Sequence, residues 1–164
     1  MDKKEYNDIV KTHSGSLYRF ILKMLRDSDG ANDIVQDAFL KLWQHVDEVE
    51  FIKAKSWLFT TARNTMLNQL KRDKRKESMD AIEGNEPFTR QENFELKELI
   101  DKSLDLLPEI QKTIILLRDL EGYDYKEIGN ILNLNESQVK VYLFRGRQKI
   151  KEVLKNANTY HENN

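Results

Sequence analysis

The stretch DYKEIGNILNLNESQVKVYLFRGRQKIK, residues 124–151, decides how the C-terminal half of the chain folds. It opens with Asp124 and Glu127 at the spacing of a capping box, in which the acid accepts a hydrogen bond from a free backbone N–H at the start of a helix. Asn133 ends the helical pattern, and asparagine is one of the few residue types that tolerate a left-handed turn. The segment therefore predicts a short capped helix followed at once by a tight turn.

A second helix follows that turn. Asn135 can cap its first turn, with Gln138 at the reciprocal position. Its apolar side carries Val139, Tyr142, Leu143 and Ile150, and its other side carries Gln138, Lys140, Val141, Arg145 and Lys149. Two short helices around a tight turn, the second one basic, predict a helix-turn-helix whose second helix fits the major groove of DNA. A helical hairpin with a solvated basic face is the alternative.

One glycine interrupts this second helix. Gly146 stands in the helix interior, where glycine costs about 1 kcal/mol relative to alanine. Two explanations fit: close packing against another helix, or a backbone that approaches a phosphate.

Composition favours a small helical protein. The 164 residues carry a formal net charge of −1, 34% are charged, and only 6 Gly and 2 Pro are present, which fits one or two small domains. Without cysteine the chain has no disulfide framework, thiolate zinc site or thiol nucleophile. No apolar run approaches the roughly 20 residues of a membrane span, and the first residues lack the apolar core of a signal peptide. We therefore expect a cytoplasmic protein without membrane insertion.

The near-zero net charge hides two basic blocks. Between Arg63 and Lys76 stand six basic residues and one acid, and a second basic block begins at Lys140. From Glu77 to Glu109 ten acids stand against three basic residues. Two basic blocks separated by an acidic stretch suggest two contacts with a polyanion. Solvated helix faces are the alternative explanation.

Apolar residues repeat at intervals of three and four along almost the whole chain, which predicts an all-α fold. The repeats cover residues 17–25, 34–46, 57–70, 94–107 and 110–120, with a break at residues 27–30 and a stop at Gly122. No stretch of useful length alternates with the period of two that a half-buried strand would show.

The domain organisation follows from where the period is lost. The segment 78–92 has no helical period and contains Gly84 and Pro87, which indicates a flexible linker. We expect two small helical domains, residues 1–77 and 93–155, the second a four-helix domain with the helix-turn-helix. Residues 156–164 are expected to form a disordered tail.

Three blocks in this order resemble the bacterial RNA polymerase sigma factors of the extracytoplasmic-function (ECF) class, two-domain members of the sigma-70 superfamily. The blocks are DIVQDAFLKLW (33–43), SWLFTTARNTMLNQLKR (56–72) and LPEIQKTIILLRDLEGYDYKEIGNILNLNESQVKVYLFRGRQKI (107–150). The resemblance extends from about residue 6 to residue 154. It implies a region 2-like first domain that binds the polymerase and the promoter −10 element, and a region 4-like second domain that reads the −35 element.

The resemblance also implies which residues meet the polymerase. The first block would dock on the β′ clamp of core RNA polymerase, and the β flap would be a second contact. The polar side chains of the block lie away from its apolar stripe and are free for another protein; a solvated acidic face is the simpler interpretation without the resemblance. The expected polymerase-binding residues are Asp33, Gln36, Asp37 and Lys41.

A −10 reader holds bases out of an opening duplex, which takes cations for the backbone and surfaces for the splayed bases. By resemblance the loop VEFIKAKS (49–56) captures a base, and Asn64 on the following helix is the best candidate for a base contact. Trp57 is interpreted as a core residue. The expected −10 residues are Phe51, Lys53, Lys55, Arg63, Asn64, Asn68, Lys71 and Arg72.

In the −35 reader the groove-facing positions follow from the second helix of the helix-turn-helix. Val141 stands where the family usually has a small polar residue, and it could contact a thymine methyl group. The expected −35 residues are Ser137, Gln138, Lys140, Val141, Phe144, Arg145 and Lys149.

Together these expectations describe a dissociable initiation subunit that is not an enzyme, with no cofactor and no catalytic or metal-binding residues. It binds core RNA polymerase and promoter DNA, assists promoter melting, and is a monomer when free. The resemblance implies an anti-sigma factor as a further partner.

Three other functions were weighed against this one. A polymerase-independent, homodimeric helix-turn-helix regulator explains residues 96–154 but leaves residues 33–72 without a task. A metal-dependent nuclease is disfavoured, because His13, His45 and His161 share no ligand spacing and no Gly-rich phosphate loop is present. An adaptor that binds polymerase without reading promoters stays open.

Overall fold

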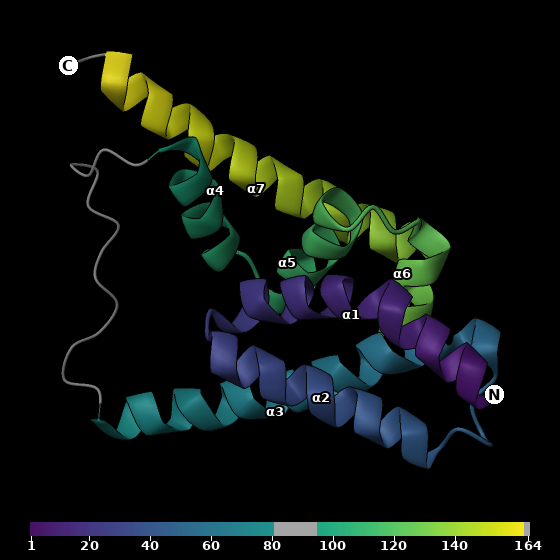
Figure 1. Cartoon of the computed structure of the whole chain (residues 1–164). Coiled ribbons are helices and arrows are strands. Elements are labelled where there is room, and N and C mark those ends of the chain that lie inside the picture. Colours follow the sequence, from purple (N-terminus) through teal and green to yellow (C-terminus); the bar gives the residue numbers. More distant parts are fainter. Residues whose placement is uncertain (81–94, 163–164) are drawn as a thin grey trace. The chain divides into compact units, whose positions relative to one another are not determined.

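The computed structural model describes residues 1–80 and 95–162, and the chain divides into two compact units (Figure 1). All regular structure in these two described ranges is helical, which confirms the predicted all-α class. The first unit contains α1–α3, and the second contains α4, α5, the first part of α6 and α7; residues 129–133 are grouped with the first.

The first unit is a bundle of three helices, α1 (Lys3–Leu25), α2 (Ser28–Gln44) and α3 (Ala54–Asp80), each of which packs against the other two. A short 3₁₀ turn, η1 (Phe51–Lys53), leads into α3. Apolar residues at the predicted spacing of three and four fill the core. Its fully buried members include Leu17, Phe20, Ile21, Leu42, Leu58, Phe59 and Met66.

The break between the first two helices is shorter than the sequence predicted. Arg26 closes α1 in a left-handed conformation with φ of 57°, and Asp27 caps α2 by accepting a hydrogen bond from the Asp29 backbone N–H. Gly30, which the sequence placed in the break, lies in the first turn of α2. A single left-handed residue and a side-chain cap therefore suffice to turn the chain.

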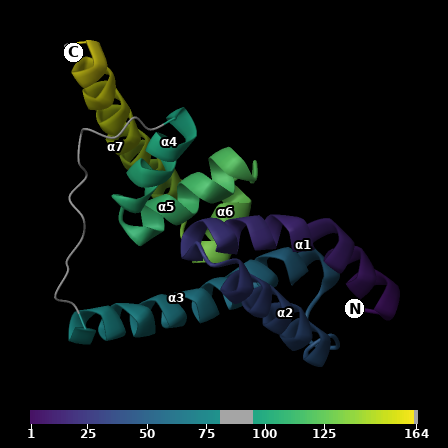
Figure 2. The same cartoon turned by 60° about the vertical axis from the view of Figure 1, so that its left-hand side comes forward.

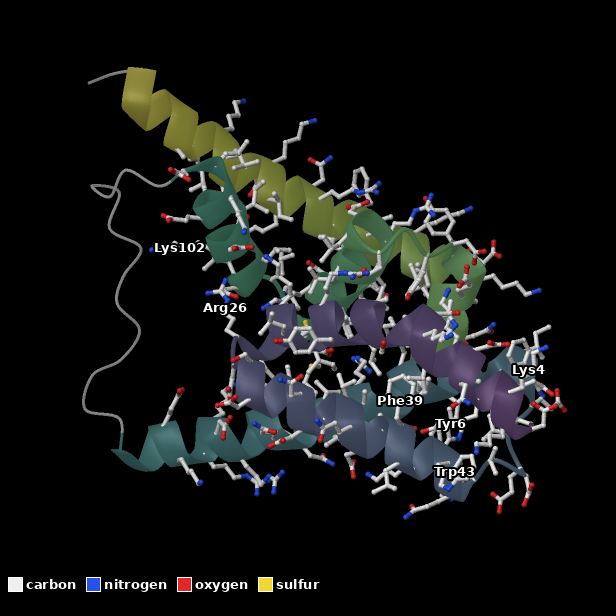
Figure 3. All side chains as sticks on the ribbon, viewed as in Figure 1. Lys4, Tyr6, Arg26, Phe39, Trp43 and Lys102 are labelled. Atoms are coloured by element: carbon white, nitrogen blue, oxygen red, sulfur yellow. The ribbon has the colours of Figure 1, made fainter. Side chains whose placement is uncertain are left out.

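Tyr6 ties the N-terminal part of α1 to α2 (Figure 3). Its hydroxyl donates a hydrogen bond to the Phe39 carbonyl oxygen at 2.9 Å, and its ring meets Trp43 edge-on, with 5.0 Å between the ring centroids. Burial raises the pKa of the Tyr6 phenol above its ordinary value, since the protein disfavours the charged form there. Despite this contact Trp43 is 45% exposed, although it falls within the apolar repeat at residues 34–46.

The last helix of the first unit extends beyond the bundle. Figure 2 shows the C-terminal part of α3 continuing past α1 and α2. Every residue from 71 to 77 is exposed, which includes the basic run that the sequence singled out. Because the charged side chains have no core to join there, this half-helix remains accessible on all sides.

The second unit is organised around α7 (Glu136–Glu162), against which α4 (Leu96–Asp105) and α5 (Glu109–Ile115) both pack. Helix α5 continues into a π-helical turn, η2 (Leu116–Leu120), and the chain then reverses at Gly122. Gly122 has φ of +74°, which confirms the predicted stop and explains the residue type. Helix α6 (Tyr125–Leu132) then leads to α7.

The helices of the structure extend beyond the predicted domain limits. Helix α3 runs to Asp80, three residues into the expected linker, and the rest of that linker lies outside the described residues, as does Phe94. Helix α7 continues to Glu162, so residues 156–162 are helical where the sequence predicted a disordered tail. That expectation is corrected: the segment contains no Gly or Pro to end the helix.

Candidate nucleic-acid interface

Side-chain caps shape the turn between α6 and α7. Asp124 accepts a hydrogen bond from the Glu127 backbone N–H at 2.8 Å, as the capping box predicted. Asn135 and Gln138 cap α7 reciprocally: each backbone N–H donates to the other residue's side-chain oxygen, at 2.8 and 3.0 Å. Asn133 has φ of 56°, which confirms the left-handed turn. Asp124 therefore caps α6, and the start of α7 is fixed by Asn133, Asn135 and Gln138.

The inner side of α7 is anchored in the second unit. Val139 is fully buried and Leu143 almost so, in agreement with the predicted apolar stripe. Gly146 is also buried, and a Cβ atom there would lie 2.6 Å from Ile115 Cδ1 and 3.4 Å from Gln111 Cβ, both on α5. Close packing against α5, rather than a nearby phosphate, is therefore enough to explain the glycine.

The outer side of α7 carries every residue expected to read the −35 element, and all of them are exposed. They are Ser137, Gln138, Lys140, Val141, Phe144, Arg145 and Lys149. Val141 and Phe144 are exposed by 46% and 64% despite their apolar side chains. A shallow, open hollow of about 270 Å³ lies along the first turns, lined by Asn135, Ser137, Gln138, Val141, Tyr142 and Arg145. The arrangement offers polar groups, an apolar contact and a guanidinium side by side.

The cations of α7 fall into two groups. Arg147 pairs with the Asp119 carboxylate, with 3.0 Å between Arg147 Nε and Asp119 Oδ2 and a second, shorter contact through Nη2. This hydrogen bond raises the pKa of the Arg147 guanidinium. Arg147 is therefore committed to joining α7 to η2, whereas Arg145, two residues earlier, faces the hollow.

Lys140 has an aromatic neighbour on another element. Its Nζ lies 5.3 Å from the centroid of the Tyr125 ring, and the guanidinium carbon of Arg118 lies 4.6 Å from the same centroid. Arg118 also donates a hydrogen bond to the Tyr123 carbonyl oxygen at 3.0 Å. Neither Arg118 nor Tyr125 was among the residues expected to contact DNA.

The candidate −10 surface lies on the first unit, on η1 and α3. Phe51 is 45% exposed, and the neighbouring Ile52, which the sequence analysis passed over, is 85% exposed. Lys53 lies 3.7 Å from the Glu50 carboxylate, with both side chains largely in solvent. In the sequence, Phe51 and Ile52 are two adjacent apolar residues inside a charged loop, and that pattern could have marked Ile52.

The polar face of α3 matches the expected positions. Asn64, Asn68, Lys71 and Arg72 are exposed, and Lys55 and Arg63 are half-buried. Trp57 is also half-buried rather than a core residue, with its ring centroid 5.7 Å from that of His45. Its ring is therefore partly accessible at the base of the loop.

The candidate partner-protein surface lies on α2. Asp33 and Gln36 are exposed, while Asp37 forms an ion pair with Lys41 at 2.9 Å, so these two side chains steady each other. Leu40, at 55% exposure, lies on the same helix face as Asp33 and Gln36. Leu40 is out of phase with the buried positions of α2, so the apolar repeat did not include it and it was passed over.

A metal-binding cluster and a membrane-spanning helix are both absent from the described ranges. Residues 1–80 and 95–162 contain no group of three or more His, Asp or Glu side chains placed to hold a metal ion. No helix within them is long and apolar enough to cross a membrane.

Two family models match the chain, in the order that the sequence blocks suggested. Sigma-70 region 2 matches residues 9–76 and Sigma-70 region 4 matches residues 97–150, so together they span most of the chain. The chain belongs to the ECF class of the sigma-70 family.

Relatives of similar length support the assignment. The ECF RNA polymerase sigma factor SigM of Bacillus subtilis is 29% identical over 88% of this chain and 92% of its own length. The ECF RNA polymerase sigma-E factor of Escherichia coli K12 is 28% identical over 91% of this chain and 86% of its own length.

Two solved structures share the fold. The sigma factor RpoE of Bartonella quintana, solved with the anti-sigma factor NepR, has a TM-score of 0.73 and 25% identity, over 93% of this chain and 98% of that one. CnrH, solved with the cytosolic domain of CnrY, has a TM-score of 0.71 and 20% identity, over 94% and 90%. In this sigma factor the residues expected to bind the polymerase lie on α2, those expected to read the −10 element lie on η1 and α3, and those expected to read the −35 element lie on α7.

Proposed function

We propose that this sigma factor is a dissociable initiation subunit that binds core RNA polymerase, recognises promoter −10 and −35 elements and assists melting. The observation that carries the proposal is the pairing of a region 2 unit and a region 4 unit in one chain, each with an exposed face suited to its task. The second unit alone would fit an ordinary DNA-binding regulator. The first unit, with its exposed α2 and η1 surfaces, has a task only in a polymerase complex.

The polymerase contact is assigned to α2. Asp33, Gln36 and the apolar Leu40 form one exposed face, and an apolar residue inside a polar rim is the usual composition of a protein interface. The Asp37–Lys41 ion pair pre-orients one edge of that face. Trp43, held by Tyr6, extends the apolar part.

The DNA contacts are assigned to η1 and α3 for the −10 element and to α7 for the −35 element. Phe51 and Ile52 offer an exposed ring and an exposed aliphatic wedge, the side chains that stack on or separate bases. Arg145 offers a guanidinium suited to the edge of a guanine. Neither contact needs to be tight alone, because tethering on the polymerase supplies a high effective concentration.

An anti-sigma factor is proposed as a regulatory partner. The RpoE and CnrH structures were both solved as complexes, RpoE with the anti-sigma factor NepR. Such a protein would act by covering the polymerase-binding and DNA-reading faces at once.

The proposal is tested by run-off transcription from genomic DNA fragments, with core RNA polymerase in the presence and absence of the protein. We expect new transcripts whose upstream regions share two elements. If the protein instead retards DNA without polymerase and yields no new transcript, the homodimeric regulator replaces this proposal.

Two variants locate the functions once a promoter is known. Arg145→Ala should lower −35-dependent transcription by about tenfold, the value of one good base contact, without changing the affinity for core polymerase. Its matched control is Arg147→Ala on the same helix, which removes a cation already paired with Asp119 and should leave promoter use almost unchanged. Equal losses for the two variants would contradict the assignment, and no loss for either would favour the adaptor.

The double variant Gln36→Ala, Asp37→Ala should do the reverse. It removes polar groups from the α2 face, so the affinity for core polymerase, measured by titration of labelled core enzyme, should fall. Normal binding to core enzyme would show that the polymerase contact lies elsewhere.

A further inference from the structure

A cluster formed by Arg118, Tyr125 and Lys140 brings together three elements at the edge of the α7 hollow. Arg118 comes from the π turn η2, Tyr125 is the first residue of α6, and Lys140 lies in the second turn of α7. Both cations lie within 6 Å of the Tyr125 ring centroid, the range in which a cation is attracted to an aromatic face. The ring therefore links the first helix of the helix-turn-helix to the second.

The cluster is held from the Arg118 side. Arg118 donates a hydrogen bond to the Tyr123 carbonyl oxygen, and Tyr123 is itself buried. A guanidinium fixed in this way gives the Tyr125 ring a stationary neighbour, 4.6 Å from its centroid. The ring in turn restrains the long and otherwise mobile Lys140 side chain, which would lose rotamer entropy on binding if it were free.

The two cations of the cluster differ from Arg147. Arg147 is neutralised by Asp119, whereas within the described residues no carboxylate lies at ion-pair distance from Arg118 or Lys140. An aromatic ring holds a cation without cancelling its charge, so both keep their attraction for an anion. Lys140 is exposed and adjoins Val141, which lines the hollow proposed for the bases.

We propose that Tyr125 is a positioning residue for DNA: its ring holds Lys140 against a backbone phosphate next to the bases that α7 reads. This inference rests on the proposed function of α7. The anion is a phosphodiester of the −35 duplex, since a cation placed beside the recognition surface meets the backbone that borders the groove. Tyr125 acts through Lys140 and need not touch the DNA itself.

The test is a double-mutant cycle on promoter binding by the complex of core polymerase and the full chain. Tyr125→Leu should weaken binding about two- to fivefold, the value of an exposed cation–π contact. In a Lys140→Ala background the same change should have almost no effect. Tyr125→Phe, which keeps the ring and removes the hydroxyl, should behave like the original protein.

Several outcomes overturn the inference. A Tyr125→Leu effect of equal size with and without Lys140 would show a separate role for the tyrosine. A loss in Tyr125→Phe equal to that in Tyr125→Leu would assign the effect to the hydroxyl. A Lys140→Ala variant with normal binding would remove the phosphate contact. Thermal unfolding of each variant, expected to match the original protein, separates positioning from folding.

Failure of the inference is distinguishable from failure of the proposed function. If Arg145→Ala lowers promoter binding but the Tyr125 cycle shows no coupling, α7 reads DNA and only the positioning role is wrong. If neither Arg145→Ala nor Lys140→Ala changes promoter binding, α7 does not read the −35 element.

If Lys140→Ala does weaken promoter binding, promoters that carry a single methylphosphonate linkage locate the phosphate. Neutralising the phosphate that Lys140 contacts should abolish the effect of Lys140→Ala.

Discussion

Single residues with unusual backbone angles divide into those that the sequence predicts and those that it does not. Asn133 and Gly122 were expected to turn the chain, and both have positive φ. Their residue types tolerate that conformation by themselves. Arg26 also has positive φ, yet an arginine carries no such signal. It turns because α1 and α2 must both pack in the bundle, which is a property of the whole unit.

Replacing Asn133 tests the left-handed turn. Asn133→Ala should lower the free energy of unfolding by about 1 kcal/mol, because a Cβ without a helpful polar group is disfavoured at positive φ. Asn133→Gly should be neutral or stabilising. Thermal melts of the full chain measure both, and about 1 kcal/mol corresponds to roughly 4–8 °C in a unit of this size. An alanine variant as stable as the glycine variant would contradict this account.

The site residues were predicted best where their residue type and helical phase agree. On α7 every residue placed on the outer face is exposed, since buried Val139 and Leu143 fix the phase of the helix. Leu40 and Ile52 fall outside the buried apolar repeats and carry no polar group, so they were not singled out as contact residues. Trp43 and Trp57 were counted with the apolar repeats, yet each is partly exposed.

Among the elements, the helices follow from their apolar period, but their irregular parts do not. The π turn η2 and the 3₁₀ turn η1 change the number of residues per turn locally, and a period of three and four cannot reveal that change. The length of α3 and α7 was also underestimated. Both continue as helix after their apolar stripe ends, since no glycine or proline stops them at that point.

The contact between α5 and α7 gives a prediction about packing. Gly146→Ala should destabilise the protein even though alanine is the better helix former, because its Cβ would collide with Ile115 Cδ1. Ile115→Val removes that carbon atom. The cost of Gly146→Ala should therefore fall by about 1 kcal/mol in the Ile115→Val background. Equal costs in the two backgrounds, measured by thermal unfolding, would show that this contact does not explain the glycine.

The turn η1 gives a prediction about melting. Ile52→Ser should change the melting temperature very little, because the side chain is already in solvent. Promoter opening, measured by permanganate reactivity of unpaired thymines, should decrease because an apolar wedge is lost. Ile52→Val is the matched control and should open the promoter normally. Normal opening by Ile52→Ser would remove Ile52 from the −10 surface.

At the scale of the whole molecule, positive and negative charges nearly cancel but are concentrated in different segments of the chain. A net charge of −1 gives little general attraction for DNA, although two helices carry exposed basic runs. We therefore infer that delivery to the promoter depends on core RNA polymerase.

That charge balance predicts a strong dependence on polymerase. At about 0.15 M salt the protein alone should bind duplex DNA no more tightly than an ordinary non-specific binder, with a dissociation constant on the order of 10⁻⁵ M or weaker. Addition of core enzyme should produce tight binding to promoter fragments only. Fluorescence anisotropy of labelled duplexes measures both. Tight, sequence-specific binding without polymerase would favour the dimeric regulator instead.

The alternation of buried and exposed positions along α7 has an evolutionary consequence. Val139, Leu143 and Gly146 hold the helix, while Ser137, Val141 and Phe144 are exposed and take no part in that packing. We therefore expect substitutions in the outer set to cost little folding stability, so that the proposed promoter preference can change while the scaffold is kept. The same independence makes the outer set a natural starting library for redirecting the protein to a new promoter in an engineered gene circuit.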